Sequence, residues 1–220
     1  MLARLPASGS TAGTRLPVEA ALSFGKSSGT FRILVRILVM MAWRYREDRA
    51  TQAAARLLQL RGGSMSYLKL MKLLYISDRK ALVELGRPIT FDRFFSMKHG
   101  PVLSRTLDVM RGRTRAEYWK QYISPPDDFE LHLLTDEPPR EKLSRAEEAI
   151  LDSVFREYGH YDKYDLRDLT HTFPEWHNPG DSSSEIDLRD MLTGQGLTED
   201  EASAIESSLE DAAALDALLA

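Results

Sequence analysis

Apolar residues recur every three or four positions between residues 49 and 60, which is the spacing of an amphipathic helix. The stripe runs from Ala53 to Leu60. Asp48 is of a type that caps helix N-termini, and Gly62 is of a type that ends helices. The pattern predicts a first helix over residues 49–60, capped by Asp48.

A wider apolar stripe follows, from Leu70 to Leu85. Ser64 or Ser66 provides a capping hydroxyl before it, and Gly86 provides the stop after it. Because this stripe covers more than one side of a helix, we expect a long helix that is surrounded by other elements.

Short extended segments come next. Residues 89–91 and 94–97 are rich in aromatic and β-branched side chains and predict strands. Residues 118–123 and 129–134 flank the sequence Ser-Pro-Pro-Asp-Asp at 124–128, which predicts an antiparallel hairpin.

Capping residues mark the remaining helices. Gly100 and Pro101 predict a helix with the proline in its first turn and its end at Gly112. Three more helix starts carry capping residues, which are Ser144 with Glu147, Asp162, and Thr198 with Glu201. The predicted fold class is α+β and mostly α-helical, a compact helical domain with a small antiparallel β-hairpin.

Charge divides the chain of 220 residues, whose net charge is −4, into a body and two tails. Residues 1–40 carry five bases and one acid, which gives +4, and residues 181–220 carry eleven acids and one base, which gives −10. We expect residues 1–40 to be a disordered or over-extended N-terminal extension, with Met40 or Met41 as the functional start. A targeting or membrane-contacting role is the alternative for this basic segment. Residues 41–220 are then one domain with an acidic C-terminal helix.

The sequence contains few residues that are suited to catalysis. The chain has no cysteine, which excludes disulfides, thiolate nucleophiles and cysteine-ligated metals. The densest cluster of titratable residues is His160, His171 and His177 with Asp162, Asp165 and Asp168. No two histidines have the one-turn spacing of a helical metal site, so we expect surface or capping roles. A hydrolase that uses this cluster is the weaker alternative; otherwise we expect no catalytic residues, cofactor or metal.

A basic stretch, residues 86–120, carries eight bases and three acids, a net charge of +5. Its bases are candidates for contacts with nucleic acid phosphates, with an acidic protein partner or with the acidic tail of the chain itself. A solvated loop without a partner is the remaining interpretation. The candidate partner-binding residues are Arg105, Arg111, Arg113 and Arg115.

Several motifs, in order and at consistent spacing, resemble one known family. Leu68–Tyr75 resembles the "leucine, lysine, leucine-leucine-tyrosine" helix of the Panacea domain, and Phe95–Val102 resembles its lysine–aromatic–Gly-Pro-Val signature. Leu143–Gly159, Leu166–Thr170 and Trp176 resemble its C-terminal helix, its "leucine–threonine–histidine" helix and its tryptophan. The resemblance covers about residues 50–215, and His99 stands where tyrosine is commoner.

This resemblance, to the SocA-like and phage-associated GepA-like antitoxins, implies a function. It implies a cytoplasmic, non-enzymatic bacterial or phage protein of a toxin–antitoxin system, which neutralises a cognate toxin from the adjacent gene by direct binding and needs no membrane. A nucleic-acid-binding regulator that uses the basic stretch is the alternative. We expect the motif residues to be structural, with Tyr75, Pro101 and Trp176 at least partly buried. The full motif set is Leu70, Lys72, Leu73, Tyr75, Lys98, His99, Gly100, Pro101, Val102 and Trp176.

Overall fold

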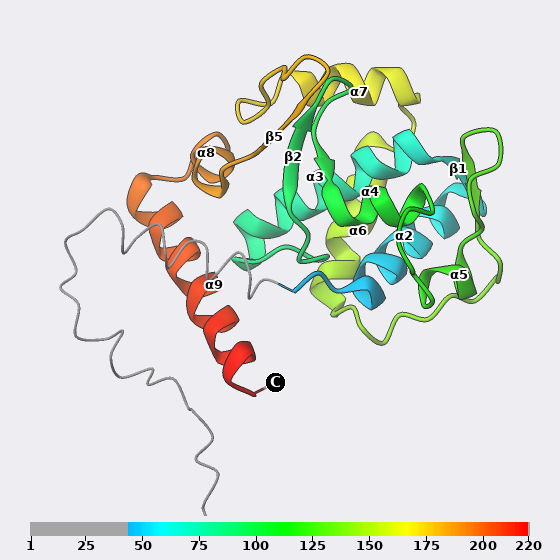
Figure 1. The fold of residues 1–220 in the computed structure, drawn as a ribbon, viewed down its shortest axis with the longest axis horizontal. Coiled ribbons are helices and arrows are strands. Elements are labelled where there is room, and N and C mark those ends of the chain that lie inside the picture. The colour runs from blue at the N-terminus through cyan, green and yellow to red at the C-terminus, as the bar shows by residue number, and fades with distance from the viewer. Residues whose placement is uncertain (1–43, 220) are drawn as a thin grey trace, which may run out of the picture. The chain divides into compact units, whose positions relative to one another are not determined.

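The computed structural model describes residues 44–219, so the expectations for residues 1–40 and for Met40 or Met41 lie outside the described residues. The helices of the described part are α2 (Glu47–Arg61), α3 (Tyr67–Leu85), α4 (Ser104–Met110), α5 (Trp119–Tyr122), α6 (Arg145–Tyr158), α7 (Lys163–His171), α8 (Leu188–Thr193) and α9 (Glu199–Leu219) (Figure 1). Its strands are β1 (Ser64–Ser66), β2 (Phe94–Met97), β3 (Val102–Leu103), β4 (Glu130–His132) and β5 (Ser183–Glu185). The predicted class, mostly α-helical α+β, is confirmed.

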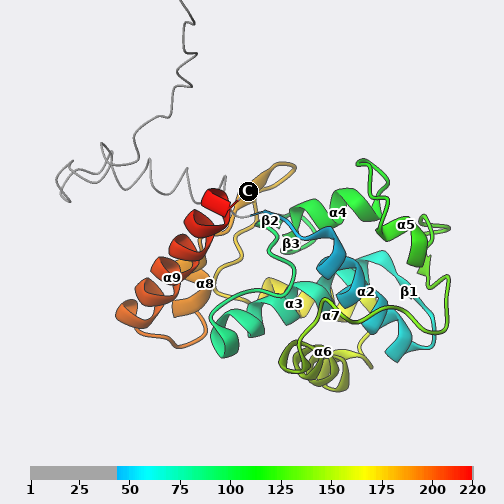
Figure 2. The same cartoon turned by 90° about the horizontal axis from the view of Figure 1, so that it is seen from below.

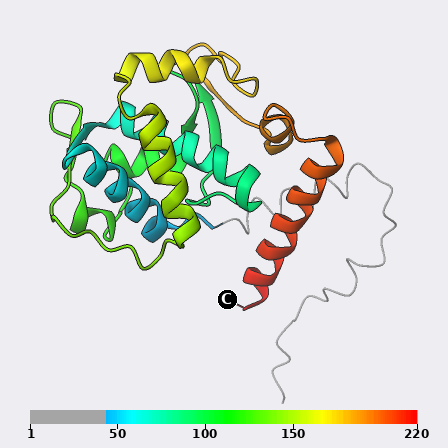
Figure 3. The same ribbon diagram turned by 180° about the vertical axis from the view of Figure 1, so that it is seen from behind.

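Helix α3 is the centre of the core, as its wide apolar stripe predicts. It packs against α2, α6 and α7, and α6 lies across α2 and α3 when the domain is viewed from behind (Figure 3). Helix α8 lies beside the C-terminal half of α3 (Figure 2), where the Gln195 side chain donates a hydrogen bond to the Arg79 carbonyl oxygen at 3.2 Å. Helix α3 therefore contacts five other helices of the described part, namely α2, α4, α6, α7 and α8.

The boundaries of the first two helices agree with the sequence except at one cap. The Ser66 hydroxyl caps α3, and left-handed glycines, Gly62 and Gly86, end α2 and α3. Asp48 does not cap α2, because the helix begins at Glu47, two residues earlier than predicted, and Arg46 occupies the cap position. Asp48 instead lies in the first turn and accepts hydrogen bonds from the Arg46 guanidinium. A negative charge in this turn also interacts favourably with the helix dipole.

The expected strand at 89–91 is replaced by a loop that a buried carboxylate holds. Asp78 is fully buried on α3 and accepts hydrogen bonds from the backbone N–H groups of Ile89 and Thr90 and from the Thr90 hydroxyl. Burial raises the pKa of Asp78 to about 7. Because the Asp78 side chain accepts hydrogen bonds from these backbone N–H groups, the segment needs no neighbouring strand. The chain then turns at Phe91, whose φ is 54°.

The helix expected to open at Gly100 and Pro101 begins later. Residues Val102 and Leu103 are the strand β3, which pairs antiparallel with β2, and α4 starts at Ser104. The start is displaced because the buried carboxylate of Asp92 caps the helix there. It accepts hydrogen bonds from the N–H groups of Arg105 and Thr106 and from the Thr106 hydroxyl.

The hairpin expected over residues 118–134 is also displaced. Residues 119–122 form the single helical turn α5, because the Glu47 carboxylate accepts the N–H groups of Tyr118 and Trp119 at 2.9 and 3.0 Å. Strand β4 pairs with β1. Residues 122–134 still turn back on themselves, because two isolated antiparallel bridges join Ile123 to Leu133 and Asp127 to Glu130. The expected hairpin is thus present only as bridges, and the hairpin built from two named strands is β2–β3.

The C-terminal helices follow the predicted caps. Reciprocal capping boxes join Ser144 to Glu147 and Thr198 to Glu201, and Asp162 caps α7. Strand β5 and helix α8 had no prediction. Strand β5 completes a three-stranded sheet in the order β3-β2-β5, although all three of its residues are exposed.

Polar groups tie α3 to the segment after α7. Tyr75 is fully buried, and its hydroxyl donates to Glu175 at 2.9 Å, while Arg79, one turn along α3, pairs with the same carboxylate at 2.7 Å. The neighbouring Trp176 is half-buried and donates its indole N–H to the Met97 carbonyl oxygen at 3.1 Å. Tyr75, Pro101 and Trp176 are thus at least partly buried, as expected from the sequence.

We predict that Trp176→Ala destabilises the domain, because it removes an indole that packs beside β2 and a hydrogen bond to the end of that strand. The expected loss is about 2–4 kcal/mol of unfolding free energy, measured by urea denaturation. Tyr164→Ala is the matched control, since Tyr164 is an exposed aromatic in the first turn of α7 and should change stability by only about 0.5 kcal/mol. Equal effects of the two substitutions would contradict the structural role of Trp176.

Candidate functional site

The Gly-Pro-Val motif forms the turn between β2 and β3, directly above α3. Gly100 has φ +89°, in the left-handed region. A Cβ atom at this position would lie 2.6 Å from Nζ of Lys72 and 2.8 Å from Oγ1 of Thr170. Glycine is therefore required here both for its backbone conformation and for the close approach of α3 and α7.

Lys72 is held below this turn. Its side chain is fully buried, and its Nζ donates a hydrogen bond of 2.7 Å to the Pro101 carbonyl oxygen. Among the described residues, no carboxylate pairs with it. Burial, with a smaller contribution from the nearby Arg167, lowers the pKa of Lys72 to about 7. The turn therefore packs on a lysine amine that is buried without a counter-ion.

His171 packs the other side of the turn. Its ring stacks on Trp176, with 4.0 Å between centroids and 6° between planes. Burial, followed by the charge of Lys72, lowers the pKa of His171. Its buried Nε2 has no hydrogen-bond partner in the described part of the chain. The lowered pKa favours the neutral form, so the histidine acts here as a packing group.

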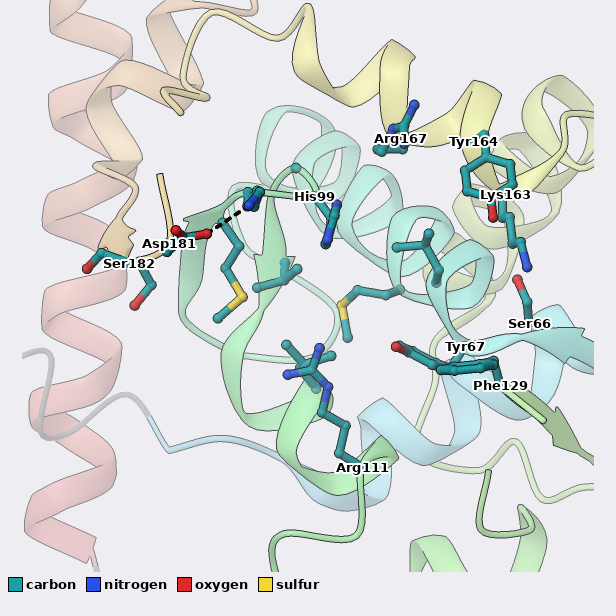
Figure 4. Close-up of a pocket in the computed structure, with 18 of the residues that line it drawn as sticks. Ser66, Tyr67, His99, Arg111, Phe129, Lys163, Tyr164, Arg167, Asp181 and Ser182 are labelled. Atoms are coloured by element: carbon teal, nitrogen blue, oxygen red, sulfur yellow. Dashed lines mark hydrogen bonds and ion pairs between the residues drawn. The ribbon is translucent and has the colours of Figure 1, made fainter. Parts of the chain in front are cut away.

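A groove of about 670 Å³ opens beside the turn (Figure 4). The N-terminal turn of α3, the β2–β3 turn, α4, α7 and residues 180–183 surround it. Its apolar lining consists chiefly of Met71, Met97, Val102 and Leu107. Thioether side chains are flexible and polarisable, so this lining can adapt to the shape of an occupant.

Aromatic side chains stand at one end of the groove. Tyr67 and Phe129 lie ring against ring with 6.0 Å between centroids, and the backbone N–H of Tyr67 donates to the Phe129 carbonyl oxygen at 2.9 Å. Tyr164 lies across from them on α7 (Figure 4). Phe129 is 63% exposed and Tyr164 is 53% exposed, so both present aromatic surface to solvent.

The groove is basic although the chain is acidic. Its lining includes four cationic side chains and one carboxylate, a formal charge of +3, against −4 for the whole chain. The charged lining residues are Lys98, Arg111, Lys163, Arg167 and Asp181. Lys98 pairs with Asp181, and Arg167 pairs with its neighbour Asp168. Within residues 44–219, no carboxylate pairs with Arg111 or Lys163.

The comparisons with known proteins identify the domain. Residues 70–177 match the family described as "Antitoxin SocA-like, Panacea domain". These residues form a SocA-like Panacea domain. No curated protein and no solved structure matches the chain.

The match is narrower than the resemblance over residues 50–215, because it starts within α3 and ends at His177. It includes every motif residue from Leu70 to Trp176. Part of the groove wall lies outside it, namely Ser66–Leu68 before the match and Gly180–Ser183 after it. The groove of this Panacea domain is therefore completed by flanking segments.

The candidate partner-binding residues are dispersed. Arg105, Arg111, Arg113 and Arg115 are all exposed, but only Arg111 lines the groove. Five of the eight bases in the basic stretch form ion pairs with carboxylates of this chain, and these are Arg87, Arg93, Lys98, Arg113 and Lys120. For Arg93 and Lys98 the partners are Glu185 and Asp181, so two bases of the stretch contact the acidic tail, which was one of the alternatives left open by the sequence.

The histidine–aspartate cluster does not converge. His160 packs on Tyr161 with 4.5 Å between ring centroids, whereas His171 stacks on Trp176. Within residues 44–219, no group of three or more histidine, aspartate or glutamate side chains is placed to hold a metal ion. No helix in that range is long and apolar enough to cross a membrane.

The sequence did not lead us to Glu175, nor to Lys163 and Tyr164 at the edge of the groove. Tyr75 and Arg79 lie one turn apart on the same face of α3. Two polar side chains on a buried helix face indicate a polar partner, and this signal could have pointed to Glu175. Lys163 and Tyr164 lacked such a signal, because their place in the groove depends on how α7 packs on α3.

We predict that Gly100→Ala strongly destabilises the Panacea domain, because the new methyl group would overlap Lys72 and Thr170 and adopt a strained φ. The expected loss is about 2–4 kcal/mol, read from urea denaturation curves. Gly196→Ala provides the control, since Gly196 has a similar φ of +92° but nothing within 4 Å of the added atom. It should cost about 1 kcal/mol. If both variants lose the same stability, the close approach to Lys72 has no energetic weight.

A second prediction concerns pH. Because the pKa of Lys72 is lower in the folded domain than the ordinary value of 10.5, the unfolded chain binds more protons between the two values. The contribution of this group to stability therefore increases as the pH rises from about 7 to 10.5, and is lost as the pH falls through that window. Between pH 7.5 and 9.5 the parent should gain on the order of 2 kcal/mol relative to Lys72→Met. Unfolding free energies that change in parallel would show that Lys72 titrates normally.

Proposed function

We propose that this protein is an antitoxin that neutralises a cognate toxin by direct protein–protein binding in the cytoplasm, without catalysis. The match of residues 70–177 to the SocA-like Panacea family carries the proposal. The groove supports it, because exposed aromatic side chains beside cations are typical of binding surfaces.

The basic stretch favours a protein partner over nucleic acid. Five of its eight bases form ion pairs with carboxylates of the chain itself, and the partners of Lys98 and Arg93 lie in or next to strand β5. Nucleic acid binding draws its affinity from bases that can each neutralise a phosphate. The bases without such a pair in the described residues, Arg105, Arg111 and Arg115, are a small remainder.

We predict that one gene adjacent to that of this protein arrests growth when expressed alone, and that co-expression of this protein restores growth. Colony counts of bacteria carrying each neighbour, with and without this chain, measure the effect. A version of the gene with an early stop codon is the control, since it keeps the transcript and removes the protein. The purified pair should also elute as one complex in size-exclusion chromatography.

Two outcomes would refute the proposal. In one, no adjacent gene is toxic. In the other, a toxic neighbour remains equally toxic when this protein is present at comparable levels.

A further inference from the structure

We propose that the groove beside the Gly-Pro-Val turn binds an acidic amphipathic segment of the toxin, with apolar side chains against the methionines and carboxylates against Arg111 and Lys163. This inference rests on the proposed function, and it adds the surface and the chemistry of the partner segment.

Exposed apolar surface gathers at this groove. Four large apolar or aromatic side chains are conspicuously exposed among the residues whose burial the structure describes, and they are Phe129, Leu134, Tyr164 and Leu215. Two of them, Phe129 and Tyr164, line the groove. Met71 and Met97 lie deeper, where flexible thioethers can fit an inserted side chain. The groove therefore provides the apolar half of a binding surface.

The openness of the rim indicates a segment of a macromolecule. Arg111, Phe129, Tyr164, Asp181 and Ser182 are all exposed, and they surround the groove in Figure 4. Sites for small molecules usually enclose most of the ligand surface, about 70–90%. A volume of about 670 Å³ with an exposed rim instead suits a few side chains of a helix or loop that continues beyond the groove.

Charge selects an acidic partner. Arg111, directly after α4, and Lys163, the first residue of α7, line the groove from different elements (Figure 4). Neither pairs with a carboxylate among the side chains that the structure describes. One carboxylate of the chain, Asp181, already lies at the rim, where it pairs with Lys98 at 2.8 Å. Both members of that pair are largely exposed, at 60% and 91% of their side chains, so the pair is weak. The groove thus keeps a formal charge of +3 on a chain of −4, which attracts acidic groups.

The test compares two charge-reversal variants that change the net charge equally. Arg111→Glu with Lys163→Glu alters the groove, whereas Arg145→Glu with Arg156→Glu alters exposed bases of α6 outside it. The probe is a labelled synthetic helical peptide with leucine on one face and glutamate on the other, followed by fluorescence anisotropy. A peptide with lysine in place of glutamate is its charge control.

The parent and the Arg145/Arg156 variant should bind the leucine–glutamate peptide equally, and the Arg111/Lys163 variant should bind it at least about tenfold more weakly. The lysine peptide should not bind the parent. Thermal melting of both variants should match the parent, since none of the four side chains is buried in the core and none forms an ion pair with a described carboxylate. The inference is overturned if the acidic peptide fails to bind, or if reversing the groove charges leaves its affinity unchanged.

Growth rescue separates this inference from the proposed function. With the toxic neighbour from the co-expression experiment, the Arg111/Lys163 variant should neutralise poorly and the Arg145/Arg156 variant fully. If the groove variant neutralises as well as the parent, the antitoxin function stands and the groove is not its docking site. If no neighbour is toxic, the proposed function fails, while the peptide measurement still decides the chemistry of the groove.

Discussion

The contact between the buried amine of Lys72 and the carbonyl oxygen of Pro101 sets the height of the β2–β3 turn above α3. Because Lys72 occupies the space under Gly100, the turn cannot accept a side chain there without displacing its neighbours. Val102 and Met97 on either side of the turn then face the groove. Burying an amine without a counter-ion is unfavourable, and the packing of α6 and α7 on α3 must offset it.

Buried acids have a comparable role elsewhere in the domain. Asp78 and Asp92 each satisfy several backbone N–H groups, so the chain between α3 and α4 is fixed without long strands. Glu147 combines the capping box of α6 with ion pairs to Arg49 and Arg87. These carboxylates accept hydrogen bonds from loop N–H groups that would otherwise need a β-sheet partner, so a small sheet is enough for this fold.

Local signals predicted the parts of the fold that local interactions determine. Ser66 and Gly86 bounded α3, and Ser144 with Glu147 marked α6, because caps act within one turn of the residues that form them. The start of α4 and the single turn of α5 were not predictable in this way, since distant carboxylates, Asp92 and Glu47, cap them. The candidate site divides similarly. The motif turn was evident in the sequence, whereas the contribution of Lys163 and Tyr164 depends on how α7 packs.

Strand β5 joins the sheet from beyond the region that matches the family, and it brings residues Gly180–Ser183 to the groove wall. Its attachment to β2 uses backbone hydrogen bonds together with the exposed pairs Arg93–Glu185 and Lys98–Asp181. All three residues of the strand are exposed, so little of the core depends on their identity. The segment is therefore an interchangeable part: replacing it would reshape one wall of the groove while the turn on Lys72 and the helical scaffold remain as they are.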